Sequence, residues 1–172
     1  MITFNNLSVG FGNHSVLKNI SGHIAKAQLV ALIGENGAGK STLLHALAGH
    51  YDFKGEVRFN NYPLSTLSQA HLATQRAVMM QSNLVGFDFS VFELIAMGRY
   101  PYAESLKMQA EKVHKYAALM DLTQYLSRRV SKLSGGEQQR VHMARTLAQL
   151  DAFSTHTKPK LMLLDEPTSA LD

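Results

Sequence analysis

The sequence contains no cysteine, which excludes disulfide bonds and cysteine-ligated metal centres. It also has no long apolar run: the densest, Leu29–Ile33 and Leu161–Leu164, fall far short of the roughly 18 residues that suggest a membrane-spanning helix. The chain does not open with a basic region followed by an apolar block, so no secretory signal is expected. We therefore expect a soluble, cytoplasmic protein that reaches a membrane only through a partner.

Basic charge is present but dispersed. The formal net charge is +4, and the densest clusters are Arg128-Arg129 and Lys158-Pro159-Lys160. A nucleic-acid interface usually shows a basic stripe or tail, so we predict no nucleic-acid partner. The histidines are dispersed as well, without the spacing of metal ligands, and surface or packing roles are expected for them.

The apolar pattern predicts an α/β protein with one domain. Alternation over Ile2–Val9 predicts an edge strand with one wet face, and the continuous run Leu29–Ile33 predicts a strand buried on both faces. Further strands are predicted at 55–59, 77–80 and 161–164, and helices at 40–48, 91–97, 103–119, 122–126 and 137–150. Strands with helical crossovers and a helical block in mid-chain predict an α/β core that carries an inserted helical lobe.

A phosphate-binding loop follows the predicted strand at Leu29–Ile33. Residues 34–41, GENGAGKS, fit the pattern G-x-x-x-x-G-K-[ST] at every fixed position. Lys40 is expected to reach the β- and γ-phosphates, and the Ser41 hydroxyl to ligate Mg²⁺. The nucleotide contacts are expected from Gly34, Glu35, Asn36, Gly37, Ala38, Gly39, Lys40, Ser41 and Thr42. The alternative is a glycine-rich turn that only connects a strand to a helix.

Two acidic residues follow the predicted strand at Leu161–Leu164. Ligands bind at the carboxyl ends of the strands in open α/β sheets, which places Asp165 to hold Mg²⁺ through water. Glu166 is then the candidate general base for an attacking water. The alternative is a strand end whose acids face solvent.

A serine-glycine segment, Leu133–Arg140, reads LSGGEQQR. Ser134 can cap a helix, and Gly135-Gly136 allow a ligand to approach the backbone closely. The segment therefore predicts a second anion site at a helix N-terminus. A plain helix cap is the alternative.

Together these motifs resemble those of ABC ATPases, whose fold is a P-loop NTPase core with a mixed sheet and an inserted helical subdomain. The resemblance implies a core at 1–85 and 137–172 and a helical signature subdomain at 86–136. It identifies Leu133, Ser134, Gly135, Gly136 and Glu137 as the signature, and Ser169, Ala170, Leu171 and Asp172 as the D-loop. Gln81 takes the place of the catalytic, Mg²⁺-contacting glutamine. Phe11 takes the place of an aromatic that stacks on adenine, with a simple core phenylalanine as the alternative.

The same resemblance implies partners and a cargo. Two ATPase subunits pack head to tail, and the signature of one closes over the ATP of the other. Residues 87–102, which include Met97-Gly98-Arg99, resemble the segment that haem and iron-siderophore importers place against a membrane subunit, although Val91 and Leu94 are equally expected in the core. With the long loop 151–160, the segment most resembles haemin-import ATPases; ferric-siderophore and vitamin B12 importers are the alternatives. Two permease subunits, an indirect periplasmic haem-binding partner and the cytoplasmic face of the inner membrane follow by resemblance.

The family places a catalytic histidine and further strands and helices beyond the D-loop, whereas this sequence stops at Asp172. The resemblance thus implies a domain whose C-terminal strands and helices are missing. We expect the chain alone to bind ATP weakly and to hydrolyse it poorly. A non-catalytic nucleotide-binding fragment and a soluble ABC protein of translation or DNA repair are the remaining alternatives.

Overall fold

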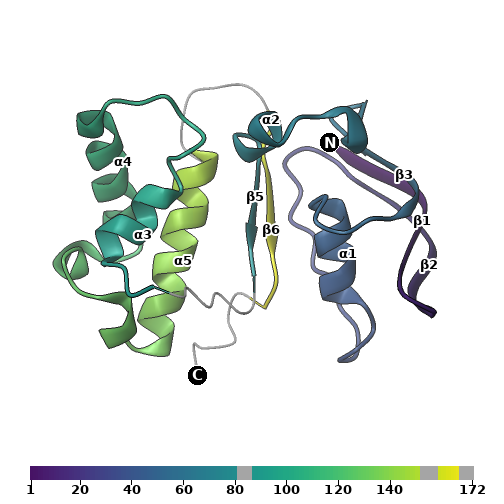
Figure 1. The fold of residues 1–172 in the computed structure, drawn as a ribbon, viewed down its shortest axis with the longest axis horizontal. Helices are drawn as coiled ribbons and strands as arrows, with labels where there is room; N and C mark the ends of the chain where they lie inside the picture. Colours follow the sequence, from purple (N-terminus) through teal and green to yellow (C-terminus); the bar gives the residue numbers. More distant parts are fainter. Residues whose placement is uncertain (81–86, 152–158, 167–172) are drawn as a thin grey trace. The chain divides into compact units, whose positions relative to one another are not determined.

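The computed structural model describes residues 1–80, 87–151 and 159–166. The chain divides into two compact units, residues 1–69 and 70–172 (Figure 1). The division into a nucleotide-binding core and a helical subdomain at 86–136 stays a prediction. Within the described residues no helix is both long enough and apolar enough to cross a membrane.

The first unit is built on a four-stranded antiparallel sheet in the order β2-β1-β3-β4. Its elements are β1 (Ile2–Phe11), β2 (His14–Ile24), α1 (Lys40–Leu47), β3 (Lys54–Phe59) and β4 (Tyr62–Pro63). The strand predicted at the start of the chain exists, but its placement at a sheet edge is wrong. β1 pairs with both β2 and β3, because alternating burial reports one wet face and not the number of neighbouring strands.

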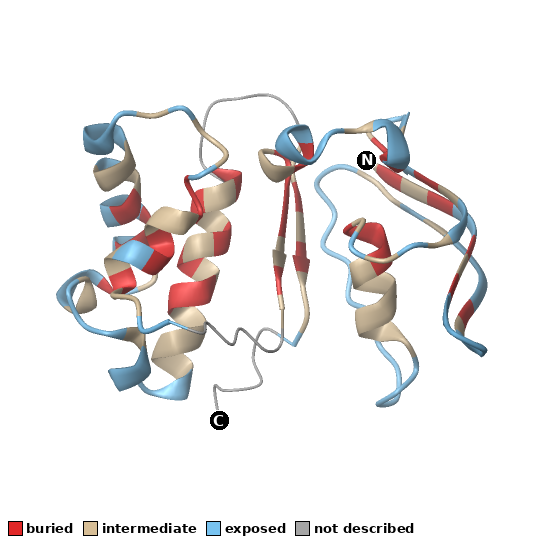
Figure 2. Ribbon diagram, in the orientation of Figure 1, coloured by how far each residue is buried: buried red, intermediate tan, exposed pale blue. Residues whose placement is uncertain are grey.

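The buried strand predicted at Leu29–Ile33 is absent. These residues have no regular secondary structure in the described chain, and Leu29 and Ile33 are 100% and 90% exposed. An apolar run supplies a tendency to be buried, whereas a strand also needs a neighbour for its backbone hydrogen bonds. In the described chain none of the four strands of this sheet, β2, β1, β3 and β4, pairs with this stretch. Figure 2 shows this stretch of the unit in the colour of exposed residues.

The second unit combines a two-stranded parallel sheet with a helical block. Its elements are β5 (Arg76–Met79), α3 (Val91–Met97), α4 (Leu106–Leu119), α5 (Gly135–Leu150) and β6 (Leu161–Leu164), with α2 (Gln69–Ala73) at the boundary between the units. The predicted strands and helices are thus confirmed, with two corrections. α4 begins later than Ala103 because the Ser105 side chain caps it by accepting from Met108 N–H, and Leu122–Leu126 forms only a 3-10 turn at Thr123–Tyr125.

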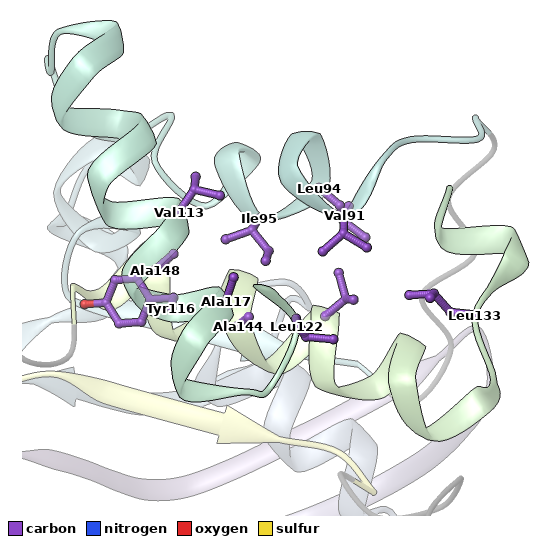
Figure 3. Close-up of a cluster of buried hydrophobic side chains, with 11 residues drawn as sticks. Val91, Leu94, Ile95, Val113, Tyr116, Ala117, Leu122, Leu133, Ala144 and Ala148 are labelled. Carbon is purple, nitrogen blue, oxygen red and sulfur yellow. The ribbon is translucent and has the colours of Figure 1, made fainter. Parts of the chain in front are cut away.

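The core of the second unit lies where α3, α4 and α5 meet (Figure 3). Its buried residues are Val91, Leu94, Ile95, Val113, Tyr116, Ala117, Leu122, Leu133, Val141, Ala144 and Ala148. Val91 and Leu94 are therefore core residues and not part of an exposed docking surface. Full burial of a valine or leucine side chain stabilises a fold by about 2 kcal/mol, so this cluster fixes the three helices against one another.

Candidate nucleotide-binding site

The loop at residues 34–39 owes its shape to two glycines in the left-handed region. Gly37 has φ 83° and Gly39 has φ 89°, conformations that cost an L-residue energy. Gly39 also packs closely, since a β-carbon there would lie 2.8 Å from Leu17 Cδ2. It forms the N-cap of α1, so the expected loop-to-helix transition is confirmed even though the preceding strand is not.

Lys40 is held by the loop itself. Its Nζ donates hydrogen bonds to the carbonyl oxygens of Gly34 at 2.8 Å and Glu35 at 2.7 Å. The turn is closed by Ala38 N–H, which donates to Glu35 O at 3.2 Å. The ammonium group and the N-terminus of α1 thus lie on the same short loop. Both carry the positive charge that favours a phosphate there.

Phe11 ends β1 with half of its surface exposed, so the alternative of a core phenylalanine is wrong. Its ring contacts Tyr51 edge to face, with centroids 5.2 Å apart. Tyr51 stacks in turn on His45 of α1, with centroids 4.7 Å apart. A chain of three rings therefore links Phe11 to the helix that begins at the phosphate loop. No motif in the sequence points to Tyr51.

The carboxylates of the second unit lie where β6 ends. Asp165 N–H donates to Met79 O at 2.9 Å, which extends the parallel pairing of β5 and β6 by one more bond. Glu166 follows in the left-handed region with φ 48°. Its carbonyl oxygen accepts from Gln139 Nε2 of α5 at 3.3 Å. The backbone of the candidate general base is therefore tied to the helix that starts at the serine-glycine segment.

The serine-glycine segment forms a capping box at the start of α5. Ser134 Oγ accepts from Glu137 N–H at 3.3 Å, and a Glu137 carboxylate oxygen accepts from Ser134 N–H at 2.7 Å. These bonds from the Ser134 backbone and hydroxyl lower the pKa of Glu137. Buried Leu133 anchors the segment in the helical core. The predicted cap is confirmed, with Gly135 and Gly136 in the first turn of a helix of 16 residues.

The order of these elements, phosphate loop, capped serine-glycine helix and acidic strand, agrees with the comparison to known families. The family model described as ABC transporter (ABC_tran) matches residues 17–169. The chain belongs to the ABC transporter family.

Relatives of this ABC chain carry a shared name. Proteins named Hemin import ATP-binding protein HmuV are similar to it in Shewanella denitrificans, with 42% identity, and in Idiomarina loihiensis and Escherichia coli O157:H7, each with 43%. These matches cover 99–100% of this chain but 65–67% of the relatives, so the chain spans about two thirds of their length.

Solved structures of ABC proteins resemble the fold. A metal-chelate type ABC transporter in an inward-facing conformation matches with a TM-score of 0.78 and 27% identity, over 99% of this chain and 61% of that one. A bacterial Atm1-family ABC exporter with ATP bound matches with a TM-score of 0.82 and 29% identity, over 99% of this chain and 30% of the exporter chain.

The ABC motifs are distributed over both units. The phosphate loop and Phe11 belong to the first, whereas the signature, Asp165 and Glu166 belong to the second. Gln81 and the D-loop residues 169–172 lie outside the described residues. Mg²⁺ prefers oxygen ligands, and the donors predicted for it among the described residues, the Ser41 hydroxyl and the Asp165 carboxylate, fit that preference. The part of the chain that the structure describes contains no cluster of three or more histidine, cysteine or acidic residues suited to a metal.

Proposed function

We propose that this chain is the nucleotide-binding part of the ATPase subunit that energises a haemin importer. The observation that carries the proposal is the identity of 42–43% to haemin import ATP-binding proteins along the whole chain. The capped signature helix supports ATPase chemistry independently, because it presents backbone N–H groups where a phosphate can be bound.

The phosphate loop, Lys40, Glu166 and Phe11 have separate roles in the proposed hydrolysis of ATP. The loop amides and Lys40 bind the β- and γ-phosphates and offset the charge that develops as the bond from the γ-phosphorus to the bridging oxygen breaks. Glu166 accepts a proton from the water that attacks the γ-phosphorus, so that ADP and phosphate leave. When bound, Mg²⁺ neutralises phosphate oxygens, and Ser41, Asp165 and Gln81 are the residues that would hold it. Phe11 stacks on the adenine ring.

The proposed partners follow from the same function. A second copy of the subunit contributes Ser134, Gly135 and Gly136 to the ATP held by the first, which makes closure of the pair depend on ATP. Two membrane permeases receive the resulting motion, at the cytoplasmic face of the inner membrane. A periplasmic haem-binding protein acts on the opposite side of the same permeases.

Import of another metal chelate is the second candidate. It is supported by the similarity of the fold to a transporter of metal-chelate type. Ferric siderophores and vitamin B12 are the cargoes of this candidate. A nucleotide-binding role without hydrolysis is the third, and it differs from both in needing no Glu166.

The deciding experiment measures uptake of labelled haemin and of a labelled ferric siderophore in a strain with this gene disrupted. The strain is complemented with the intact gene or with a Lys40→Ala version, which lacks the phosphate-binding ammonium. The proposal expects haemin uptake to be lost, restored by the intact gene and not restored by Lys40→Ala. Loss of siderophore uptake alone would assign the second candidate. Restoration by Lys40→Ala and by Glu166→Gln would contradict a role in ATP hydrolysis.

A further inference from the structure

The C-terminal end of α5 is capped by side chains from other segments. The last carbonyl groups of an α-helix lack partners within the helix. Here Arg99 Nη1 donates to Ala148 O, Tyr102 Oη donates to Gln149 O at 2.6 Å, and Lys160 Nζ donates to Leu150 O and, at 3.0 Å, to Asp151 O. We call Arg99, Tyr102 and Lys160 the α5 clamp. Two of its three members are cations, which also favour the negative end of the helix dipole.

Arg99 is the centre of the clamp. Its side chain is 0% exposed, its guanidinium lies 3.9 Å from the centroid of the Tyr102 ring, and its Nε donates to a Glu104 carboxylate oxygen at 3.0 Å. Its Nη1 also lies 3.9 Å from an Asp151 carboxylate oxygen. A buried charge is costly unless it is paired, and the planar fork of arginine spreads five N–H donors over three nitrogens, whereas lysine has a single donor nitrogen.

Asp151 joins α4 to the same end of α5. Its carboxylate accepts from Lys112 Nζ at 3.0 and 3.1 Å and from Tyr116 Oη at 2.9 Å. Burial alone would raise the pKa of Asp151, but these hydrogen bonds and the charges of Arg99 and Lys112 outweigh burial and lower it. The carboxylate is therefore charged at neutral pH, with Lys112 and Tyr116 of α4 bonded to it and Arg99 close by.

The backbones of α3 and α5 touch next to the clamp. A β-carbon on Gly98 would lie 2.4 Å from Arg145 O and 3.1 Å from Gln149 N, so no larger residue fits there without moving α5. Gly98 directly follows α3 and precedes Arg99. The end of α3 is consequently fixed on the last turns of α5 by both contact and charge.

The beginning of α3 is bound to the segment that leads into the signature. Val91 N–H donates to Arg128 O at 3.0 Å, and Phe92 N–H donates to Leu126 O at 2.9 Å. Val130 N–H returns a bond to Phe89 O at 2.9 Å, shortly before Ser134. α3 is therefore bound to the signature segment at one end and to the last turns of α5 at the other.

We propose that Arg99 is a positioning residue for ATP hydrolysis, which fixes the orientation of α5 and hence of Ser134, Gly135 and Gly136. It acts from the far end of the helix, since 16 residues span about 24 Å. The inference rests on the proposed function only in assigning the signature to a nucleotide held by a second copy. It predicts that Arg99 affects turnover and leaves the binding of nucleotide to the phosphate loop unchanged.

The test compares Arg99→Lys with the unmodified protein, purified as the cell makes it and together with its membrane partners. A lysine keeps the buried charge, but its single nitrogen replaces the separate Nε and Nη1 donors that reach Glu104 and Ala148 O. The expected result is a fall in kcat of about two- to thirtyfold, the range of long-distance coupling between sites. The melting temperature should fall, because the buried pairing of Arg99 is disturbed. The dissociation constant for a fluorescent ATP analogue should stay close to that of the unmodified protein.

Two further variants make the result decisive. Arg58→Lys is the matched control, because Arg58 also pairs with a carboxylate, Glu56, at 2.7 Å but is exposed and lies in the first unit. It should change neither kcat nor affinity. Tyr102→Phe removes the hydroxyl and its bond to Gln149 O but keeps the ring beside Arg99. It should lower kcat less than Arg99→Lys, which keeps the test valid if the latter variant does not fold.

An unchanged kcat in both clamp variants would overturn the proposal. So would parallel losses of kcat, affinity and melting temperature, which would indicate a purely structural role. These outcomes are separable from the choice of cargo, because ATP turnover is measured directly. If haemin uptake does not depend on the gene while Arg99→Lys still lowers kcat selectively, the cargo is wrong and the role of Arg99 stands.

Discussion

The ring of Tyr51 contacts the ring of Phe11 edge to face, with the planes at 86°. Phe11 is exposed at the end of β1 and would be free to rotate if nothing supported it. Tyr51 is itself stacked on His45, which belongs to the helix that follows the phosphate loop. The contact therefore couples the predicted base-stacking residue to the predicted phosphate site within one unit.

Replacing Tyr51 with alanine should weaken ATP binding. Aromatic pairs contribute about 0.5–1.5 kcal/mol beyond area burial, so the dissociation constant should rise by about two- to tenfold. Tyr51→Phe keeps the ring and should bind ATP like the unmodified protein. Titration with a fluorescent ATP analogue measures both, and equal affinity of all three proteins would show that Phe11 needs no support from Tyr51.

The two left-handed glycines of the phosphate loop should respond differently to alanine. Gly37→Ala meets no atom within 4 Å and introduces backbone strain alone, of about 1 kcal/mol. Gly39→Ala adds a clash with Leu17 to a similar strain. We expect a larger drop in melting temperature and a greater loss of nucleotide affinity for Gly39→Ala. Calorimetry of the two variants checks the order, which a reversed ranking would refute.

Ser134 of the signature and Ser90 are both N-cap residues in capping boxes. Ser90 and Glu93 form the same capping box at the start of α3 that Ser134 and Glu137 form at the start of α5. Ser90→Ala and Ser134→Ala should each cost about 1 kcal/mol of stability through the lost cap. Only Ser134→Ala should also lower kcat, because only that helix N-terminus is proposed to face a nucleotide. Similar kcat values in the two variants would show that Ser134 only caps α5 and has no role in turnover.

Acid should destabilise the second unit through His142. Burial, with a smaller contribution from the charge of Arg145, lowers the pKa of His142 to about 4 from an ordinary value of 6.5. Between these values the unfolded chain binds the proton and the folded chain does not. Stability is therefore full above pH 6.5 and falls as the pH drops towards 4, by up to about 3 kcal/mol.

His142→Gln isolates this contribution, since all other groups titrate in both proteins. The difference in unfolding free energy between the two should be constant above pH 7 and should shift in favour of the variant as the pH is lowered to 5. Urea titrations at pH 5, 6 and 7.5 measure it. A difference that does not vary with pH would mean that His142 is not held neutral by burial.

Local sequence determined the features that need only neighbouring residues. The helix cap at Ser134, the glycine-rich loop before α1 and the acidic pair after β6 each depend on a few consecutive residues, and the structure has each of them where the sequence pattern predicts it. These features carry the family resemblance, which is why the sequence alone predicts the candidate site. The donors and acceptors of their hydrogen bonds lie within a few residues of one another, so these bonds need no partner from a distant part of the chain.

Tertiary structure decided what depends on distant partners. Alternation could not reveal that β1 has a neighbour on each side, and the apolar run Leu29–Ile33 could not supply a strand with which to pair. Nor could sequence show that Arg99, an ordinary charged residue after a helix, lies fully buried against the end of α5, or that Gln139 reaches Glu166. The physical reason is the same in each case. A strand needs a neighbouring strand for its backbone hydrogen bonds, and a buried charge needs a partner to offset the cost of its burial. Folding brings both kinds of partner together across many residues of chain.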